Sequence, residues 1–413
     1  MTTPCRICLV TSAHVSANPR LVKEADALVE EGFDVTVVAI DMNEGLRLLD
    51  RTVLESRPWK IEKVSRRHIF IYALQTILQR AARFLLGLTK IDNVRLARLA
   101  HDRLDWRLSR AAGNVAADLY LAHTVAGLGP AFTAAQKNGA KLGFDAEDFH
   151  TEELTPAQRN SGDQVARDII QQRLLPRCVH LSASSPLIAD AYRKKYGVEA
   201  DTILNVFPIS DAPASPLAPS ECEPRSMYWF SQTIGEGRGL EAFLEAMSYL
   251  SKPATLWLRG NPAPGYERQL RSAAERLGVE PCLRFLPVSA PDTMARLAQP
   301  YQLGLAIEPG VSFNNQIALS NKAFTYVLAG IPVLFSRTPA QEALAAELGD
   351  ASLLVDLGQP REVARVLDAF FEDESLRERA RHKAWLVGRE RYNWDIEKLK
   401  FLSCVRDALG GTL

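Results

Sequence analysis

Short continuous apolar runs and helically spaced apolar positions alternate along the first half of the chain. The continuous runs predict buried strands at 6–10, 34–40, 117–122 and 141–144. Between the first two runs, Asn18 and Pro19 precede apolar positions that recur at helical spacing, namely Leu21, Ala25, Leu28 and Val29. Asn18 is therefore the predicted cap of a helix that begins at Pro19. A strand, a helix and a second strand in this order are typical of a parallel α/β sheet.

The same alternation begins again near residue 226. The patterns predict strands at 226–230, 255–260, 283–286 and 302–308, and helices at 240–249, 266–277, 290–299 and over most of 361–410. A proline- and serine-rich segment, 208–219, separates the two halves and favours an extended linker. The sequence thus predicts an N-terminal domain at 1–208, a hinge at 209–224 and a C-terminal domain at 225–391. A last helix, at about 392–413, is expected to pack back on the first domain.

Composition excludes several classes of protein. The 413 residues are 47% hydrophobic, and 49 basic residues balance 49 acidic ones, so no net charge attracts nucleic acid. No apolar run approaches the length of a membrane span, and Met1 to Pro4 lead straight into a strand without a signal peptide. The 6 cysteines are scattered, and Cys5 and Cys8 have no second pair at zinc spacing. We expect a cytoplasmic protein with reduced thiols.

Residues 66–110 differ in charge from the rest. They hold 10 Lys and Arg against 3 Asp, a net charge of +7. The segment opens with Arg66, Arg67 and His68, and apolar residues then recur at helical spacing at Ile77, Leu78, Ala81, Phe84, Leu85 and Leu88. A basic amphipathic helix of this kind can lie on an anionic membrane surface. The alternative is a helix that packs on its own domain with a solvated basic face.

The stretch from Ser320 to Leu334 combines a helix start with a buried strand. Ser320 or Asn321 is the predicted helix cap, Gly330 ends the helix, and the apolar run after it is a strand buried on both faces. The free N–H groups of a helix start suit an anion, and Lys322 supplies a charge beside them. A solvated lysine beside an ordinary cap remains the alternative.

A glycine-rich loop precedes the helix at 240–249. Gly235, Gly237 and Gly239 allow the backbone to approach an oxyanion, and Arg238 between them can bind phosphate through two hydrogen bonds. An ordinary glycine turn with a surface arginine is the alternative. The first strand of the chain has no Gly-x-Gly-x-x-Gly after it, which disfavours a dinucleotide-dependent dehydrogenase.

Polar residues crowd the ends of two predicted strands in the first domain. His123 ends one strand, and the next is followed by Asp145, Glu147, Asp148 and His150. Ligands bind beyond the carboxyl ends of strands in open parallel sheets, so these residues are the best candidates for a site in the first domain. A metal is conceivable from their composition, but neither an Asp-x-Asp motif nor zinc spacing is present, and no metal is expected.

The stretch with Asn321, Lys322, Phe324, Tyr326, Gly330 and Pro332 resembles the nucleotide-sugar site of the retaining glycosyltransferases of family 4, which have the GT-B fold. The segment 16–38 is similar to the opening of the N-terminal domain in that family. The resemblance covers nearly the whole chain. It implies an α/β protein of GT-B architecture, with two Rossmann-like parallel-sheet domains facing across a cleft.

The resemblance also implies roles for individual residues. His123 would face the sugar near the reacting centre, and Arg238 and Lys322 would stabilise the departing diphosphate. The acceptor side of the site would be formed by Asn18, Asp145, Glu147, Asp148 and His150. The donor would be held by Gly235, Gly237, Gly239, Glu308, Asn315, Ser320, Asn321 and Thr325. The chain departs from the family where two glutamates are usual, because Ile317 and Thr325 occupy those positions. A neutral hydroxyl is a weaker acceptor than the carboxylate that usually holds the donor ribose.

The implied activity is transfer of a sugar from a nucleotide-sugar to an acceptor hydroxyl with retention of anomeric configuration, without metal or other cofactor. The transfer would serve the assembly of a surface glycan or a natural-product glycoside, and 66–110 would contact the anionic membrane peripherally.

Two alternatives remain open. One is a nucleotide-sugar epimerase with the GT-B fold, which needs no acceptor. The other is a non-catalytic GT-B binding protein, favoured by Ile317 and Thr325.

Overall fold

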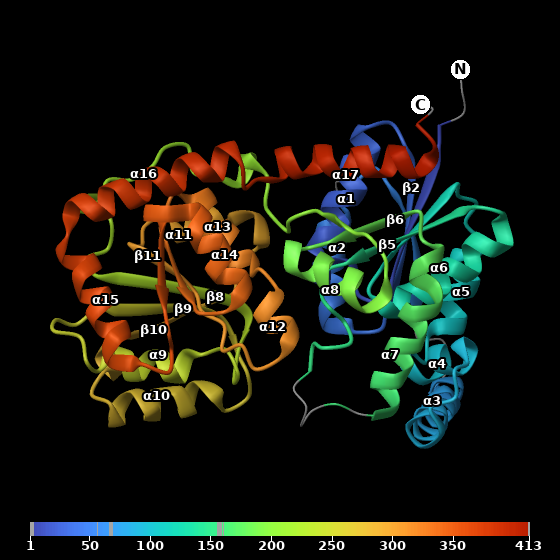
Figure 1. Ribbon diagram of the computed structural model, residues 1–413, viewed down its shortest axis with the longest axis horizontal. Helices are drawn as coiled ribbons and strands as arrows, with labels where there is room; N and C mark the ends of the chain where they lie inside the picture. The colour runs from blue at the N-terminus through green and yellow to red at the C-terminus, as the bar shows by residue number, and fades with distance from the viewer. Residues whose placement is uncertain (1–3, 56, 66–68, 155–158, 160, 412–413) are drawn as a thin grey trace. The chain divides into compact units, whose positions relative to one another are not determined.

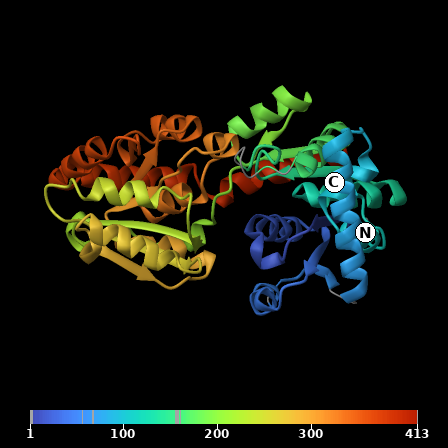
Figure 2. The same ribbon diagram turned by 90° about the horizontal axis from the view of Figure 1, so that it is seen from below.

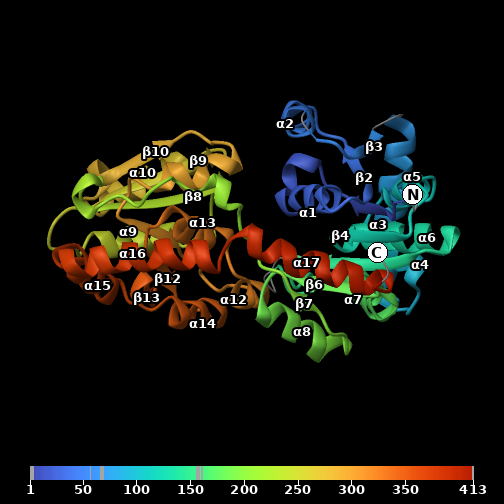
Figure 3. The ribbon, with the colours of Figure 1, turned by 90° about the horizontal axis from the view of Figure 1, so that it is seen from above.

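The computed structural model describes residues 4–55, 57–65, 69–154, 159 and 161–411. The chain divides into two compact units. Unit 1 comprises residues 1–203 and 398–413, and unit 2 comprises residues 204–397. The predicted linker residues 209–224 thus lie within unit 2, and Arg66, Arg67 and His68 of the predicted basic segment lie outside the described residues. In both units helices cover the two faces of a sheet (Figure 1, Figure 2 and Figure 3).

The sheet of unit 1 has 7 strands in the order β3-β2-β1-β4-β5-β6-β7, and all its pairs are parallel. The strands are β1 (Arg6–Thr11), β2 (Asp34–Asp41), β3 (Lys60–Ser65), β4 (Leu119–His123), β5 (Lys141–Ala146), β6 (His180–Ala183) and β7 (Asp201–Thr202). The helices are α1 (Pro19–Glu30), α2 (Glu44–Leu54), α3 (Ile69–Thr89), α4 (Val94–His101), α5 (Asp105–Ala112), α6 (Val125–Asn138), α7 (Ser161–Leu174) and α8 (Pro186–Tyr196). Strands β1, β4 and β5 are almost wholly buried, as their continuous apolar runs predict.

The sheet of unit 2 has 6 parallel strands in the order β10-β9-β8-β11-β12-β13. These strands are β8 (Ser226–Ile234), β9 (Thr255–Pro262), β10 (Leu283–Leu286), β11 (Leu303–Ala306), β12 (Val333–Ser336) and β13 (Ser352–Val355). The helices are α9 (Leu240–Met247), α10 (Tyr266–Arg276), α11 (Met294–Ala298), α12 (Phe313–Ile317), α13 (Asn321–Ala329), α14 (Pro339–Leu348), α15 (Pro360–Glu372) and α16 (Glu374–Glu390). The last helix, α17 (Trp394–Leu409), begins in unit 2 and ends in unit 1.

Two local predictions about helix starts have different outcomes. Asn18 caps α1 as predicted, because its side chain accepts a hydrogen bond from the backbone N–H of Leu21. Ser320 stands at the cap position of α13 but makes no such bond, so the predicted side-chain cap is wrong. Its hydroxyl oxygen lies 3.2 Å from the Lys322 ammonium. This contact occupies the oxygen that would otherwise accept a hydrogen bond from a backbone N–H of the first helical turn.

Candidate functional site

His123 lies at the point where the strand order of unit 1 reverses. The chain runs outward from β1 to β3 and then returns to the other side of β1 as β4, whose last residue is His123. His123 stands in register with Thr11, the last residue of β1. Ligands of open parallel sheets bind beyond the strand ends at such a reversal. The sequence therefore placed His123 at the correct edge of the sheet.

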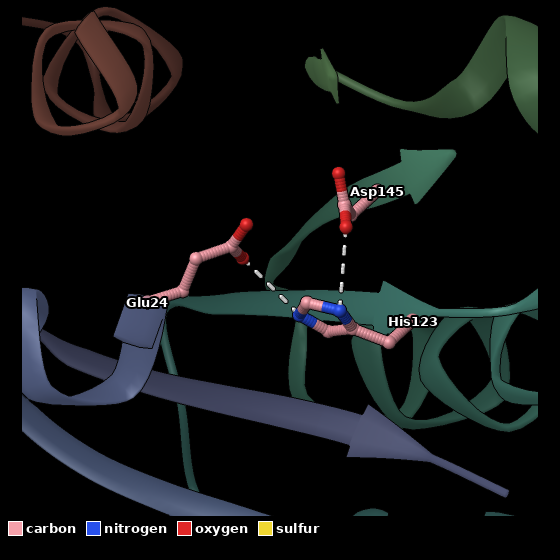
Figure 4. A group of neighbouring side chains, drawn as sticks. All are labelled: Glu24, His123 and Asp145. Carbon is pink, nitrogen blue, oxygen red and sulfur yellow. Dashed lines mark ion pairs between the residues drawn. The ribbon is translucent and has the colours of Figure 1, made fainter. Parts of the chain in front are cut away.

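The imidazole of His123 is fully buried between two carboxylates (Figure 4). Its Nε2 lies 3.2 Å from Oε2 of Glu24, and its Nδ1 lies 3.4 Å from Oδ2 of Asp145. Arg20 donates to both oxygens of Asp145, at 2.7 and 2.8 Å, and its Nε lies 3.2 Å from Glu24. These four side chains, Arg20, Glu24, His123 and Asp145, form the buried charge cluster, and none is more than 1% exposed.

The protonation state of His123 follows from these neighbours. Burial alone would lower the pKa of His123, but the neighbouring carboxylates of Glu24, Glu147 and Asp145 outweigh burial and raise that pKa to about 10. The ring is therefore an imidazolium at neutral pH, with no nitrogen lone pair to accept a proton. It does not act as a general base in this state. The contact with a sugar that the resemblance implies stays a prediction.

Glu24, His123 and Asp145 also lie close enough to form a candidate set of metal ligands, with their ligand atoms within 4.8 Å of one another. Burial and the charge of Asp145 raise the pKa of Glu24, and the Arg20 guanidinium and the His123 imidazolium already face the two carboxylates. Cation binding would require His123 to lose its proton and Asp145 to give up two hydrogen bonds from Arg20. The donor chemistry of the cluster thus favours the internal ion pairs over a metal, and we propose no metal here.

The remaining acceptor-side candidates are only partly brought together. Glu147 is 4.0 Å from His123 and borders the buried charge cluster. The backbone carbonyl of Asp148 accepts a hydrogen bond from the Tyr192 hydroxyl. His150 instead pairs with Glu153, and its backbone carbonyl accepts from Arg167. Burial would lower the pKa of His150, but Glu153 outweighs that effect and raises it.

Sequence reasoning missed Arg20 and Glu24, which supply half of the buried charge cluster. A signal was present, because Glu24 follows Leu21 by three residues and precedes Leu28 by four, and so lies on the apolar stripe of α1. A charged residue on a buried helix face needs a partner of opposite charge. Arg20, one turn earlier on α1, is such a partner for Glu24, but the sequence does not say where Arg20 finds its second carboxylate, since Asp145 is 125 residues away.

The glycine loop and the helix with Lys322 meet at the corresponding reversal in unit 2. This reversal lies between the neighbouring strands β8 and β11. Gly235, Gly237 and Gly239 follow β8, and the last two have positive φ angles of 73° and 76°, which favour glycine. Arg238 is partly exposed and has no ion pair among the described residues of the chain. It is therefore available to an anion.

Lys322 makes a nearly buried ion pair just inside the start of α13. Its Nζ lies 3.4 Å from Oε1 of Glu308, and the two side chains are 10% and 14% exposed. The ammonium also lies 5.4 Å from the ring centroid of Trp229, within the range of a cation–π contact. Glu308 follows β11, and its backbone N–H and carbonyl both bond to the hydroxyl of Ser336 at the end of β12. Glu308 is thus held at the sheet edge by its backbone.

Tyr326 fixes the position of α13 on this sheet. Its buried hydroxyl lies 3.0 Å from the carbonyl oxygen of Tyr228 on β8 and 3.2 Å from that of Leu305 on β11. The ring lies directly over Gly304, where an added Cβ would come within 2.3 Å of the Tyr326 ring. Only glycine permits this approach, and the start of α13 is thereby held over the strand reversal.

The other donor-side candidates are distributed along the segment from 312 to 325. The Ser312 hydroxyl lies 2.9 Å from the side-chain oxygen of Asn315 and 3.2 Å from its backbone nitrogen. The carbonyl of Asn321 accepts a hydrogen bond from the Thr325 hydroxyl at 3.0 Å, and Thr325 is 1% exposed. The Thr325 hydroxyl is thus occupied within its own helix. Ile317 is also buried.

Comparisons with known proteins establish the fold of the chain but assign it to no family. No family model matches the chain, and no curated protein matches its sequence. Among solved structures, Anabaena HepE in complex with UDP and glucose superimposes with a TM-score of 0.72 at 16% identity, over 98% of this chain and 100% of that one. Sucrose-phosphate synthase from Thermosynechococcus elongatus also gives a TM-score of 0.72, at 11% identity, over 99% and 100% of the two chains. The chain has the GT-B fold.

The lipopolysaccharide outer core galactosyltransferase WaaB is a further structural neighbour of this GT-B chain. It covers 97% of this chain and 99% of its own, at 11% identity and a TM-score of 0.64. The resemblance inferred from the residues around Lys322 is thus confirmed at the level of the fold. The two parallel α/β sheets that it implies are also confirmed.

None of the helices in the described part of the GT-B chain is both long and apolar enough to cross a membrane. This includes α3, the longest helix of unit 1, which spans 21 residues.

Proposed function

We propose that the GT-B chain is a retaining hexosyltransferase of the family 4 type, which moves a sugar from a nucleotide-sugar to an acceptor hydroxyl without a metal. The observation that carries the proposal is the pairing of Lys322 with Glu308 at the strand reversal of unit 2, beside the loop of Arg238. Support comes from the neighbour Anabaena HepE, whose structures contain UDP and UDP-glucose.

The chemistry of this site suits a departing diphosphate. Cleavage of the bond between sugar and phosphate leaves negative charge on the diphosphate, and a fixed cation stabilises that charge most strongly where water is excluded. Lys322 is such a cation, and the free N–H groups at the start of α13 add to its effect. Arg238 would approach from the glycine loop. The departing phosphate would take the proton of the acceptor hydroxyl, so no protein base is assigned.

Binding of a nucleotide tests the proposal directly. The melting temperature of the purified protein would be measured with the diphosphates of uridine, guanosine, thymidine, cytidine and adenosine, without added metal. We expect one of them to raise the melting temperature at millimolar concentration, because a ligand that binds only the folded state stabilises it. Arg238→Ala should reduce the shift, whereas Arg284→Ala, an exposed arginine of β10, should not. No shift with any of the five nucleotides would contradict the proposal.

A non-catalytic binding protein is the alternative that one observation favours. Thr325 is occupied within its helix and Ile317 is buried, so neither supplies a carboxylate to the donor. A protein of this kind would bind the nucleotide-sugar without consuming it. Release of the free nucleoside diphosphate over time, in the presence of acceptor extracts, distinguishes the enzyme from the binding protein.

We propose that α3 rests on an anionic membrane surface and that the protein works in the cytoplasm, on the inner face of the membrane. The helix packs through Ala82 and Leu86, which are buried. Its large exposed apolar residues are 42% to 70% exposed, namely Leu74, Ile77, Leu78, Phe84, Leu85 and Leu88. Arg80, Lys90 and Arg95 are exposed nearby without an ion pair among the described residues. An apolar face with basic residues beside it suits the interface of an anionic bilayer.

Vesicle binding tests this contact. We expect the protein to sediment with vesicles of phosphatidylglycerol and phosphatidylcholine, and a Phe84→Ser/Leu88→Ser double variant to lose most of that binding, because it removes buried apolar area. Leu399→Ser is the matched control, since Leu399 is also an exposed leucine, on α17. Equal sedimentation of the wild type and the double variant, or no binding by the wild type, would disprove the contact.

A further inference from the structure

The Lys322 ammonium is not a free cation in this structure. Its ammonium already contacts the Glu308 carboxylate at 3.4 Å and the Ser320 hydroxyl at 3.2 Å. Charge-assisted hydrogen bonds are usually about 2.7–2.9 Å long, so this pair is loose. A diphosphate carries more charge and more acceptor oxygens than one carboxylate, and it would compete effectively for Lys322.

Removal of Lys322 from Glu308 would leave a carboxylate that is only 14% exposed without its cation. A nearly buried carboxylate is costly unless other donors replace the lost one. The backbone of Glu308 is held by Ser336, so the residue cannot withdraw from the sheet edge as a whole. Its side chain is then open to hydroxyl or N–H donors of a ligand bound at this sheet edge.

The ligand of this site would meet no other carboxylate among the donor-side candidates. Thr325, one turn beyond Lys322, donates its hydroxyl to Asn321 and is buried. Ile317 offers no polar group. Glu308 is thus the candidate that places a carboxylate next to the phosphate-binding lysine, and a nucleotide carries a ribose diol a short distance from its phosphates.

We infer that donor binding exchanges the partners of this ion pair: the diphosphate takes Lys322, and the Glu308 carboxylate released by that step accepts hydrogen bonds from the ribose diol. The inference rests on the proposed function and assigns its ribose contact to Glu308. Phosphate and ribose recognition are then coupled. A nucleoside without phosphates does not separate Lys322 from Glu308. Inorganic pyrophosphate separates them but gives the Glu308 carboxylate no hydrogen-bond donor.

The test compares UDP, or whichever of the five nucleoside diphosphates gives the largest thermal shift, with inorganic pyrophosphate. Calorimetric titration would give both affinities for the wild type and for Glu308→Gln. We expect this substitution to weaken nucleotide binding roughly 10- to 100-fold, the usual effect of losing hydrogen bonds to a charged group. Pyrophosphate should bind the variant as tightly as the wild type or more tightly, because the amide competes less for Lys322.

Removal of one ribose hydroxyl supplies a second measurement. The wild type should prefer the nucleoside diphosphate over its 2′-deoxy form, and Glu308→Gln should bind the two nearly equally. Glu362→Gln is the matched control, because Glu362 also pairs with a cation of unit 2, Arg365, on the exposed surface of α15. It should alter neither affinity. Melting curves without ligand verify that the variants fold.

Each other outcome counts against the inference in a specific way. If Glu308→Gln weakens nucleotide and pyrophosphate equally, Glu308 only holds Lys322 in place. If both ligands bind the variant more tightly, Glu308 is only a competitor for the lysine. An unchanged affinity for both shows that the pair is irrelevant to binding. In these three cases the proposed function stands, whereas a wild type that binds no nucleotide overturns the function and the inference together.

Discussion

Replacement of Arg20 by methionine should destabilise unit 1 far more strongly than replacement of an exposed arginine. The side chain of methionine fills much of the same space, but Asp145 and Glu24 lose the cation that lies between them. Removing one partner of a buried ion pair typically costs about 3–5 kcal/mol, because the remaining charge is left without compensation. We expect a loss of this size in the free energy of unfolding, measured by urea denaturation at neutral pH.

Two controls separate the lost charge from a general effect of the substitution. Arg173→Met removes the cation of an exposed pair with Asp92 and should change the free energy of unfolding by less than about 1 kcal/mol. Asp145→Asn, introduced into the Arg20→Met protein, removes one of the stranded charges and should restore part of the stability. A loss below about 1 kcal/mol for Arg20→Met would show that the buried charge cluster is not a close ion-pair network in solution.

Replacement of Lys322 by alanine should have the largest effect on activity. It removes the cation nearest the start of α13, where the proposed function places the departing diphosphate. Loss of one preorganised group that stabilises transition-state charge typically lowers kcat by about 10²- to 10³-fold. We expect a fall of this size in the rate of transfer from the nucleotide-sugar that binds, measured as nucleoside diphosphate released per enzyme.

Further variants show whether the charge or the shape of this residue matters. Lys322→Arg keeps the charge and should retain more activity than Lys322→Ala, although its planar group does not reproduce the geometry of an ammonium. Arg337→Ala removes an exposed cation of the same unit, paired with Glu342, and should leave the rate unchanged. Full activity in the Lys322→Ala protein would remove this residue from the mechanism and leave Arg238 as the remaining side-chain cation assigned to it.

Buried strands were the part of the fold that the sequence predicted best. The run at 283–286 gave the bounds of β10 correctly, and the runs for β1 and β5 gave all but their last one or two residues.

Strand β3 and helix α2 were not predicted, and each of these omissions has a physical reason. β3 is an edge strand with one buried residue, Val64. In α2 the leucines at 48 and 49 are exposed and only Asp50 is buried. The spacing of its hydrophobic residues therefore does not indicate which face of the helix is buried.

The candidate site was predicted in position but not in its interactions. Residues at or just beyond strand ends, such as His123 and Glu308, can be placed at a sheet edge because strand ends are readable from the sequence. Their partners depend on side chains that approach from other elements. Glu24 reaches His123 from α1, and Lys322 reaches Glu308 from α13 across 14 residues. The cap predicted for Ser320 failed for the same reason, because the lysine side chain reached that hydroxyl.

The division of unit 1 into 1–203 and 398–413 has a consequence for how the protein is made. Residues 398–413 contribute Phe401 and Val405 to unit 1, and both are fully buried. The backbone carbonyl of Ala408 accepts a hydrogen bond from Lys141. A ribosome releases these residues only after all of unit 2 has been synthesised. Unit 2 can therefore complete its core before unit 1, although unit 1 is translated first, and a protein truncated near residue 397 would retain a finished second unit beside an unfinished first one.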